Sequence, residues 1–388
     1  MIDNDIFESY LHCKYKACLK LCGNHGNISE YEIMKSEIKL LYKRDALQRA
    51  ISSYDKKEIV NNQDLSSAIK YGNKAIVDAH ISHGDLQSYC DFTERTPGKS
   101  DLGAFHYLPV LFVEKEKLSK EDKLMVTYNG LVIGNMQNRQ PEYGKIIYGK
   151  RFAISKIKFD EKLDIVTKII NDLKEYYDNS SLPQLILNRH CEICEFNATC
   201  RENAIKDGNL SLLGQIGAKE ILKKNKKGIF NLTQLSYTFR PRRKRRRPDG
   251  FRRPHSVALR ALAIRENKTY VHGTPELPRK ATEIYFDVEG VEEGNFIYLV
   301  GLIVISNGQI EKHSFWANTA DEETDVFLQF LRIIKNHDGY VLYHYGSYEL
   351  SYLKRMKRKA VVVAQDIDAI IANCCNLLAV FYANVYLP

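Results

Sequence analysis

The sequence has no apolar segment of the roughly 18 residues that a membrane-spanning helix requires. Its longest apolar run extends from Ile297 to Ile305, contains Gly301 and is typical of a buried strand. The N-terminus, MIDNDIFESY, is acidic and lacks the basic and then apolar order of a signal peptide. These two absences argue against a membrane protein and against a secreted one, so we expect a cytoplasmic chain.

The sequence also lacks the even set of cysteines that a complete disulfide framework needs. Its cysteines number nine, and Cys374 and Cys375 are adjacent. In a reducing compartment, cysteines serve more often as metal ligands or buried apolar side chains than as disulfide partners. We therefore ask which of them could bind a metal.

The chain is long enough for more than one folded core. It has 388 residues, of which 44% are hydrophobic, and domains of roughly 150 residues predict two or three of them. Up to residue 239 we expect helices over 5–21, 30–51 and 160–177, a strand over 107–113 and a mixed segment over 124–132. After residue 280 we expect strands over 283–288, 296–306, 311–316 and 340–345, helices over 322–335 and from Tyr348 and Asp366. The second half therefore has the order βββαβα, and the chain belongs to the α/β class.

The formal net charge of +9 is concentrated between Arg240 and Arg253. This segment holds nine basic residues and one acid, a local charge of +8. Pro241 and Pro248 within the segment and Pro254 directly after it exclude a regular helix and predict an exposed linker. Clustered arginines neutralise phosphates, so we predict nucleic-acid contacts by a set of its arginines, the alternative being a solvated hinge. The predicted contacts are Arg240, Arg242, Arg243, Arg245 and Arg246.

The strongest motif in the first half is HCEICEFNATC, which spaces Cys191, Cys194 and Cys200 as C-x2-C-x5-C. Three thiolates from one short loop can bind one metal centre, but a tetrahedral site or a cubane needs a fourth ligand. A second C-x2-C, as in a zinc ribbon, is absent from the sequence. The fourth thiol must therefore come from a distant part of the chain.

Cys13, in SYLHCKYKACLKL, resembles the lone first cysteine of RecB-type nucleases that carry an iron-sulphur cluster. The resemblance implies that Cys13, Cys191, Cys194 and Cys200 hold a 4Fe-4S cluster that joins the two ends of the domain. Zinc is the alternative, since thiolates bind both metals, and Cys18 is an alternative fourth ligand. Incidental cysteines are the third possibility.

The resemblance to RecB-type nucleases covers most of residues 1–205 and implies a restriction-endonuclease-like PD-(D/E)XK fold. In that family an Asp and an acidic-x-Lys pair hold Mg²⁺. Asp91 stands where the first Asp is expected, whereas Leu111 and Val113 occupy the positions of the pair. Neither side chain can bind a metal or carry charge, so we expect a degenerate catalytic part with a DNA-binding or scaffolding role.

Residues 210–236 resemble a helix-hairpin-helix, with Gly214 and Gly217 in the turn and Lys219 opening a helix. In that motif a glycine turn brings backbone N–H groups at a helix N-terminus against a phosphate without reading bases. We therefore predict phosphate binding by Gly214, Gly217 and Lys219. The alternative is an ordinary connector between helices.

In IYFDVEG, Asp287 and Glu289 lie two positions apart on a predicted strand and share one face. Two such carboxylates can share a divalent metal. Glu349 follows a strand and begins a helix, as the second acidic element of RNase H-like exonucleases does, and the βββαβα order is similar to that fold. Asn376 stands where that family often has another Asp, and the chain ends at Pro388 before the region expected to supply the last carboxylate.

The whole arrangement resembles a family of predicted RecB nucleases in which a RecB-type domain is fused to an RNase H-like one. The resemblance implies a PD-(D/E)XK domain over 1–205, a helix-hairpin-helix-like segment over 206–239, a basic linker over 240–280 and an RNase H-like domain over 281–388. It also implies a nuclease that uses Mg²⁺ or Mn²⁺ on nucleic acid, DNA rather than RNA, through Asp287, Glu289 and Glu349. The alternatives are a non-catalytic nucleic-acid-binding protein and a zinc-binding scaffold. The sequence does not identify protein partners.

Overall fold

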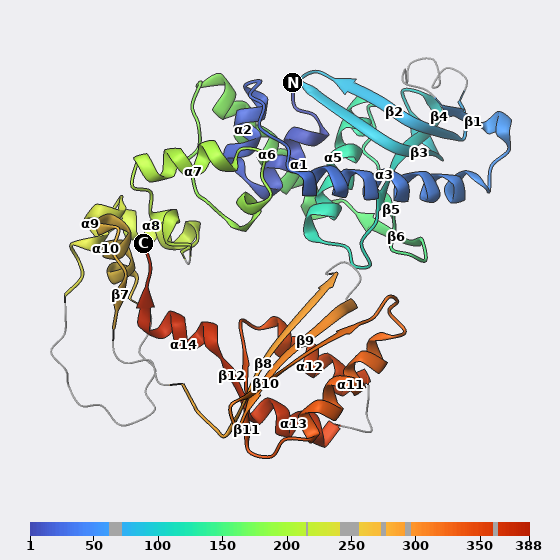
Figure 1. The fold of residues 1–388 in the computed structure, drawn as a ribbon. Coiled ribbons are helices and arrows are strands. Elements are labelled where there is room, and N and C mark those ends of the chain that lie inside the picture. Colours follow the sequence, from blue (N-terminus) through green and yellow to red (C-terminus); the bar gives the residue numbers. More distant parts are fainter. Residues whose placement is uncertain (62–71, 215, 241–255, 273–276, 292–295, 360–363) are drawn as a thin grey trace. The chain divides into compact units, whose positions relative to one another are not determined.

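The structure is a computed structural model that describes residues 1–61, 72–214, 216–240, 256–272, 277–291, 296–359 and 364–388 (Figure 1). The chain divides into two compact units, Met1–Lys227 and Gly228–Pro388. The four segments expected from the sequence are finer than this division and stay a prediction. None of the described helices is both long and apolar enough to span a bilayer.

The first unit is built on a six-stranded mixed sheet whose strands lie side by side in chain order. β1 is parallel to β2 and β4 to β5, while the other neighbours are antiparallel. The strands are β1 (Ile59–Asn61), β2 (Ala75–His83), β3 (Leu86–Ser100), β4 (Gly103–Val113), β5 (Tyr143–Tyr148) and β6 (Ala153–Lys158). α5 (Lys120–Met136) makes the crossover that the parallel pair β4 and β5 requires.

Helices cover both faces of this sheet. α1 (Asn4–His12), α2 (Lys14–Leu21) and α6 (Asp160–Asp178) pack with α5 over one face, around the stacked rings of Phe7 and Tyr128. α3 (Glu30–Ile51) contributes Ala46 to the core on the other face. The N-terminal strand-like residue Ile2 bridges to Leu86 of β3, so the first residues belong to the core.

The predicted helices over 30–51 and 160–177 are confirmed as α3 and α6, and the strand over 107–113 lies within β4. The single helix expected over 5–21 is wrong: it breaks at Cys13, whose backbone is extended (φ −158°, ψ 114°). The mixed segment 124–132 belongs to α5, which is buried on nearly all sides and so lacks an amphipathic period. The sequence patterns do not predict β2, β3, β5 and β6.

Short helices follow the first sheet. α7 (Asn197–Lys206) and α8 (Ala218–Asn225) complete the first unit. In the second unit, α9 (Leu232–Ser236) packs against α10 (Val257–Glu266), and β7 (Tyr270–Val271) pairs with β13 (Val385–Tyr386) near the C-terminus. Leu259 and Tyr386 share this small core.

The rest of the second unit is a five-stranded sheet with the order β10-β9-β8-β11-β12. β8 lies at the centre, antiparallel to β9 and parallel to β11, which is parallel to β12. The strands are β8 (Thr282–Val291), β9 (Phe296–Ser306), β10 (Gln309–Trp316), β11 (Tyr340–His344) and β12 (Cys374–Asn376). The helices are α11 (Glu323–Lys335), α12 (Tyr348–Lys359), α13 (Ala364–Ala372) and α14 (Leu377–Asn384). The predicted βββαβα order is confirmed, with α13, β12 and α14 continuing it.

One face of this sheet is covered. Phe286 of β8 packs against Phe330 of α11 with tilted rings, 4.9 Å between their centroids, and Leu353 of α12 is fully buried in the same core. Alternation along β8 places its other side chains on the opposite, exposed face. The helices thereby fix which residues of β8 meet solvent.

Leu353→Ala should lower the free energy of unfolding by about 2–5 kcal/mol, because it leaves a cavity between α12 and the sheet. Chemical denaturation followed by circular dichroism measures the change. Lys354→Ala, at the neighbouring exposed position, should change it by less than about 0.5 kcal/mol. Equal losses in the two variants would contradict this packing.

Candidate functional site

The central strand β8 carries the two carboxylates that the sequence singles out. Asp287 and Glu289 are both exposed, and they alternate with the buried side chains of Phe286 and Val288. They therefore lie on the uncovered face of the sheet, two positions apart. Both are accessible to a metal ion and to a phosphate.

Glu349, the third predicted acid, has a different environment. It is only 3% exposed in the first turn of α12, and its Oε2 lies 3.6 Å from Nδ1 of His344, which is 2% exposed at the end of β11. Among the described residues, Oε2 of Glu349 and both ring nitrogens of His344 have no hydrogen-bond partner. Burial lowers the pKa of His344, and the neighbouring carboxylate partly offsets this. The sequence does not reveal His344, because nothing in YVLYH distinguishes it from a core position.

The start of α12 nevertheless lies against the end of β8. A Cβ on Gly290 would approach the hydroxyl oxygen of Tyr348 to 2.7 Å, so the turn that carries Glu349 begins beside the strand end that carries Glu289. Glu349 itself points inward. Among the described residues, no three His, Cys, Asp or Glu side chains are placed to hold a metal ion, so the three acids come from adjoining elements but do not converge.

Asn376 stands where RNase H-like exonucleases often have another Asp, and here it has a structural role. Its Oδ1 accepts from Gly346 N at 3.2 Å and its Nδ2 donates to Gly346 O at 2.7 Å. It also caps α14 by accepting from Ala379 N. This amide holds the loop between β11 and α12, the loop that leads into Glu349.

Comparison with known proteins identifies the kind of domain in which these acids lie. A model described as the RNase_H superfamily matches residues 284–384, from β8 to α14. Residues 284–384 form an RNase H superfamily domain. The RNase H-like part of the predicted fold is thus shown, and the matched residues include Asp287, Glu289 and Glu349. The mixed sheet of the first unit is consistent with an α/β domain, and its restriction-endonuclease-like assignment stays a prediction.

No curated protein matches the chain. Among solved structures, one titled "Crystal structure of SSO0001" is 14% identical, and the alignment covers 52% of this chain and 85% of that chain with a TM-score of 0.26. This resemblance adds nothing to the family match.

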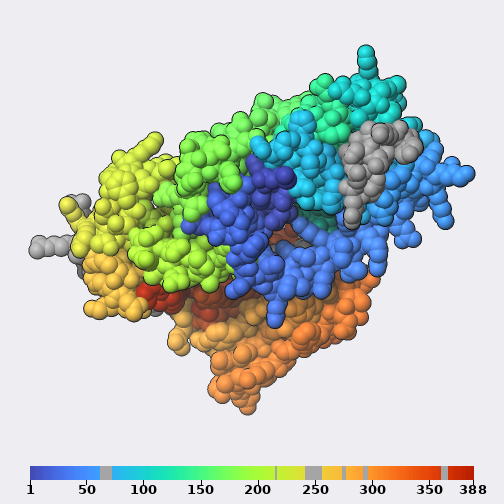
Figure 2. Space-filling model, turned by 90° about the horizontal axis from the view of Figure 1, so that it is seen from above, coloured from blue at the N-terminus to red at the C-terminus, as the bar shows by residue number. Residues whose placement is uncertain are grey.

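The first unit brings the four predicted cysteine ligands into one region. Cys13 lies in the break between α1 and α2, Cys191 and Cys194 lie in and after the turn Arg189–Glu192, and Cys200 lies on α7. Asn188 Nδ2 donates to His12 O at 3.2 Å, and the rings of His12 and His190 stack at 4.7 Å. Figure 2 shows the N-terminal residues, in blue, against the green residues near 200.

The charges of these thiols interact. Burial raises the pKa of Cys200 to about 12, and Cys194, Cys13 and Cys191 raise it further. Burial likewise raises the pKa of Cys191 and Cys194. Raised pKa values in Cys191, Cys194 and Cys200 are compatible with a metal centre, since a bound cation favours the thiolate form. Among the described residues, however, no three His, Cys, Asp or Glu side chains are placed to hold a metal ion.

The glycine turn precedes α8. Gly214 has a left-handed backbone (φ +68°) and closes the 3-10 turn Leu210–Leu213, and Gly217 is the N-cap of α8 without a side-chain cap. Lys219 is exposed in the first turn of that helix. The predicted helix N-terminus with free N–H groups is present, but the element before the turn is a single 3-10 turn rather than a full helix. Of the predicted linker contacts, Arg240 is described and exposed, whereas Arg242, Arg243, Arg245 and Arg246 lie outside the described residues.

Asp91 of β3 has a partner that the sequence does not indicate. Lys43 of α3 lies 2.9 Å from Asp91 Oδ1 and 2.9 Å from Asp78 Oδ1 on β2. Burial raises the pKa of Asp91, and Lys43 acts against this rise. Asp78 has φ +50°, and the β2–β3 pairing skips from Val77 to Ala79 at this point. Like charges on facing strands repel, so the Lys43 ammonium stabilises the pair. Val113 is buried among apolar side chains.

Lys43→Met should lower the free energy of unfolding by about 1 kcal/mol, because two partly buried carboxylates lose their shared cation. Adding Asp91→Asn should recover part of that loss, since the remaining repulsion disappears. A double-mutant cycle with Asp91→Asn alone measures the coupling by chemical denaturation. Additive effects would show that the ion pair is not formed.

Proposed function

We propose that the chain is a metal-dependent nuclease that hydrolyses phosphodiester bonds through its RNase H-like domain. The observation that carries this proposal is the position of Asp287 and Glu289. They lie exposed on the central strand of the domain that matches the RNase_H superfamily. RNase H superfamily nucleases generally use divalent metals, and paired carboxylates are the ligands that Mg²⁺ and Mn²⁺ prefer.

Asp287 and Glu289 would hold the metal, and Glu349 would complete the site. When bound, the ions would lower the pKa of the attacking water and stabilise the departing oxygen. Asp287 and Glu289, which are exposed, fit this role without any movement of their side chains. Glu349 fits only after its side chain turns from His344 toward the end of β8, and its unpartnered Oε2 has no hydrogen bond to lose in doing so.

Nucleic acid, DNA rather than RNA, is the proposed substrate. The superfamily match and the arginine-rich segment that begins at Arg240 support nucleic acid. The RecB-type resemblance supports DNA. The specific observation that favours the alternative, a non-catalytic binding protein, is the inward position of Glu349.

Asp287→Asn should reduce metal-dependent cleavage at least about 100-fold, because the amide keeps the shape but removes a ligand charge. The measurement is Mn²⁺-dependent cleavage of labelled single-stranded and duplex DNA and RNA. Glu283→Gln, which loses a carboxylate charge on the same face of β8, is the matched control and should remain active.

Asp91→Ala tests the first unit in the same assay and should also leave activity unchanged. Loss of cleavage in Asp91→Ala but not in Asp287→Asn would move the chemistry to the first unit. A wild-type chain without cleavage on any substrate would favour the non-catalytic alternative.

The second part of the proposal is a 4Fe-4S cluster held by Cys13, Cys191, Cys194 and Cys200, with Zn²⁺ as the alternative. The hydrogen bond from Asn188 to His12 supports this cluster, because it brings the distant Cys13 near the other three cysteines. A metal at this point would fasten the N-terminus of the first unit to its end. It would contribute folding energy rather than chemistry.

Protein purified without oxygen should therefore be brown and contain about four iron atoms per chain. Cys194→Ser should lose the iron and unfold the first unit at lower denaturant concentration. Cys22→Ser, an exposed thiol near the end of α2, should retain both. Metal and sulphide analysis decides: stoichiometric zinc without sulphide would replace the cluster by zinc, and no metal would refute both.

A further inference from the structure

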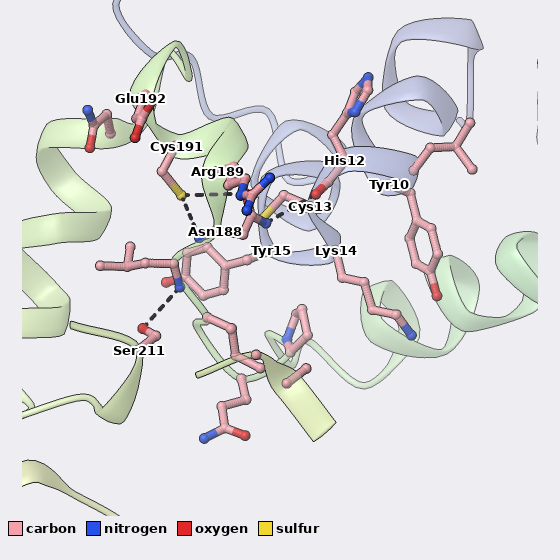
Figure 3. A pocket seen from close by; sticks show the side chains of 18 of the residues that line it. Tyr10, His12, Cys13, Lys14, Tyr15, Asn188, Arg189, Cys191, Glu192 and Ser211 are labelled. Carbon is pink, nitrogen blue, oxygen red and sulfur yellow. Dashed lines mark hydrogen bonds between the residues drawn. The ribbon is translucent and has the colours of Figure 1, made fainter. Parts of the chain in front are cut away.

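The first unit contains a large cavity that the nuclease proposal does not use. Its volume is about 1020 Å³, and it is lined by the junction of α1 and α2, by α6, by residues 183–192 and by the start of α8 (Figure 3). Cys13 and Cys191 form part of one wall. Its size is at the upper end of the range for pockets that enclose a small organic ligand.

Two guanidinium groups in this cavity have no hydrogen-bond or ion-pair partner among the described residues. Lys14 is paired with Asp172 at 3.0 Å, but Arg189 and Arg201 make no hydrogen bond through their side chains and no ion pair within the described part of the chain. Glu192 and Glu121 also line the cavity, so the wall is not uniformly basic. The two arginines are available for an anionic ligand, which a guanidinium can bind through two parallel hydrogen bonds.

The start of α8 opens into the same cavity. Gly214, Gly217 and Ala218 all line it, and α8 has no side-chain cap at Gly217. Within the described part of the chain, the N–H groups of Ala218 and Lys219 have no acceptor, whereas that of Glu220 donates to Gly217 O at 2.9 Å. The helix dipole favours negative charge at the two free donors. Arginines and a helix N-terminus around one space constitute an anion-binding arrangement.

The remaining lining is aromatic and aliphatic. Tyr15 is half-buried and faces the cavity, together with Leu187 and the buried Ile216. A planar base can stack on a tyrosine ring, an interaction that contributes about 1–3 kcal/mol per base. An inorganic anion would make no favourable contact with these apolar side chains. The combination fits a ligand with both phosphate and base.

We propose that this cavity binds a segment of single-stranded nucleic acid, with a phosphate near Arg201 and the start of α8 and a base against Tyr15. The inference rests on the proposed function, and it names the form of nucleic acid that the first unit receives. A duplex keeps its bases stacked inside the helix, so it presents phosphates but no base to the half-buried ring of Tyr15. The cavity therefore selects single strands, whereas the arginine-rich linker binds either form.

The test measures the affinity of the full chain for fluorescein-labelled oligo-dT and for a duplex of equal length, without added Mg²⁺ or Mn²⁺. The double variant Arg189→Gln/Arg201→Gln should bind oligo-dT more weakly and reduce the slope of log affinity against log salt by about 0.7, the contribution of one phosphate contact on a single strand. Tyr15→Leu should weaken oligo-dT binding about tenfold with an unchanged salt slope. Both should leave duplex affinity as in the wild type.

Lys206→Gln is the matched control, because Lys206 is an exposed cation on the same helix as Arg201 but does not line the cavity. It should bind oligo-dT as the wild type does. Wild-type affinity of the double variant for oligo-dT would overturn the inference, and so would equal competition by polyglutamate, which would reveal a general anion site. Binding is read without cleavage, so an inactive chain that still prefers single strands would refute the proposed nuclease activity alone.

Discussion

The alternation of side chains along β8 is the constraint on which the catalytic proposal depends. Phe286 and Val288 are held in the core by α11 and α12, and this leaves Asp287 and Glu289 no position except the open face. A slip of one residue in the pairing with β9 would bury both carboxylates and expose both apolar side chains. The packing of the covered face therefore sets the chemistry of the uncovered one.

The interior of the same domain holds the opposite arrangement. Glu349 and His344 are buried beside each other with unpaired polar atoms, and unpaired buried polar groups each cost about 1–3 kcal/mol. Such a cost is common at functional sites, where a group is kept ready for another position. Asn376 fixes the loop before Glu349 from the other side, so the helix start is held while the carboxylate has little to keep it inward.

The sequence predicts the C-terminal sheet well for a physical reason. β8 alternates between apolar and polar residues, β9 is apolar almost throughout, and α11 has a clear apolar stripe, so each of them shows its own pattern. It fails where burial or tertiary contacts replace the period. α5 is buried all round, and the extended backbone of Cys13 interrupts a helical pattern that the sequence continues.

The candidate sites follow the same division. Asp287 and Glu289 could be found because strand spacing alone places them together. Lys43 and His344 could not, since their partners are set by how α3 crosses β2 and β3 and by how β11 meets α12. The gathering of Cys13 with the later cysteines was expected from resemblance and not from any local pattern.

The position of the N-terminal helices also has a consequence for synthesis. Ile2 bridges to Leu86, Tyr10 donates to Asp172, and His12 accepts from Asn188. Helices α1 and α2 thus leave the ribosome up to 176 residues before their last partners. At about 5–20 residues per second this takes roughly 9–35 s. The apolar face that Phe7 shares with Tyr128 is uncovered until Tyr128 follows, so α1 is the segment of the nascent chain where a chaperone would have most to protect.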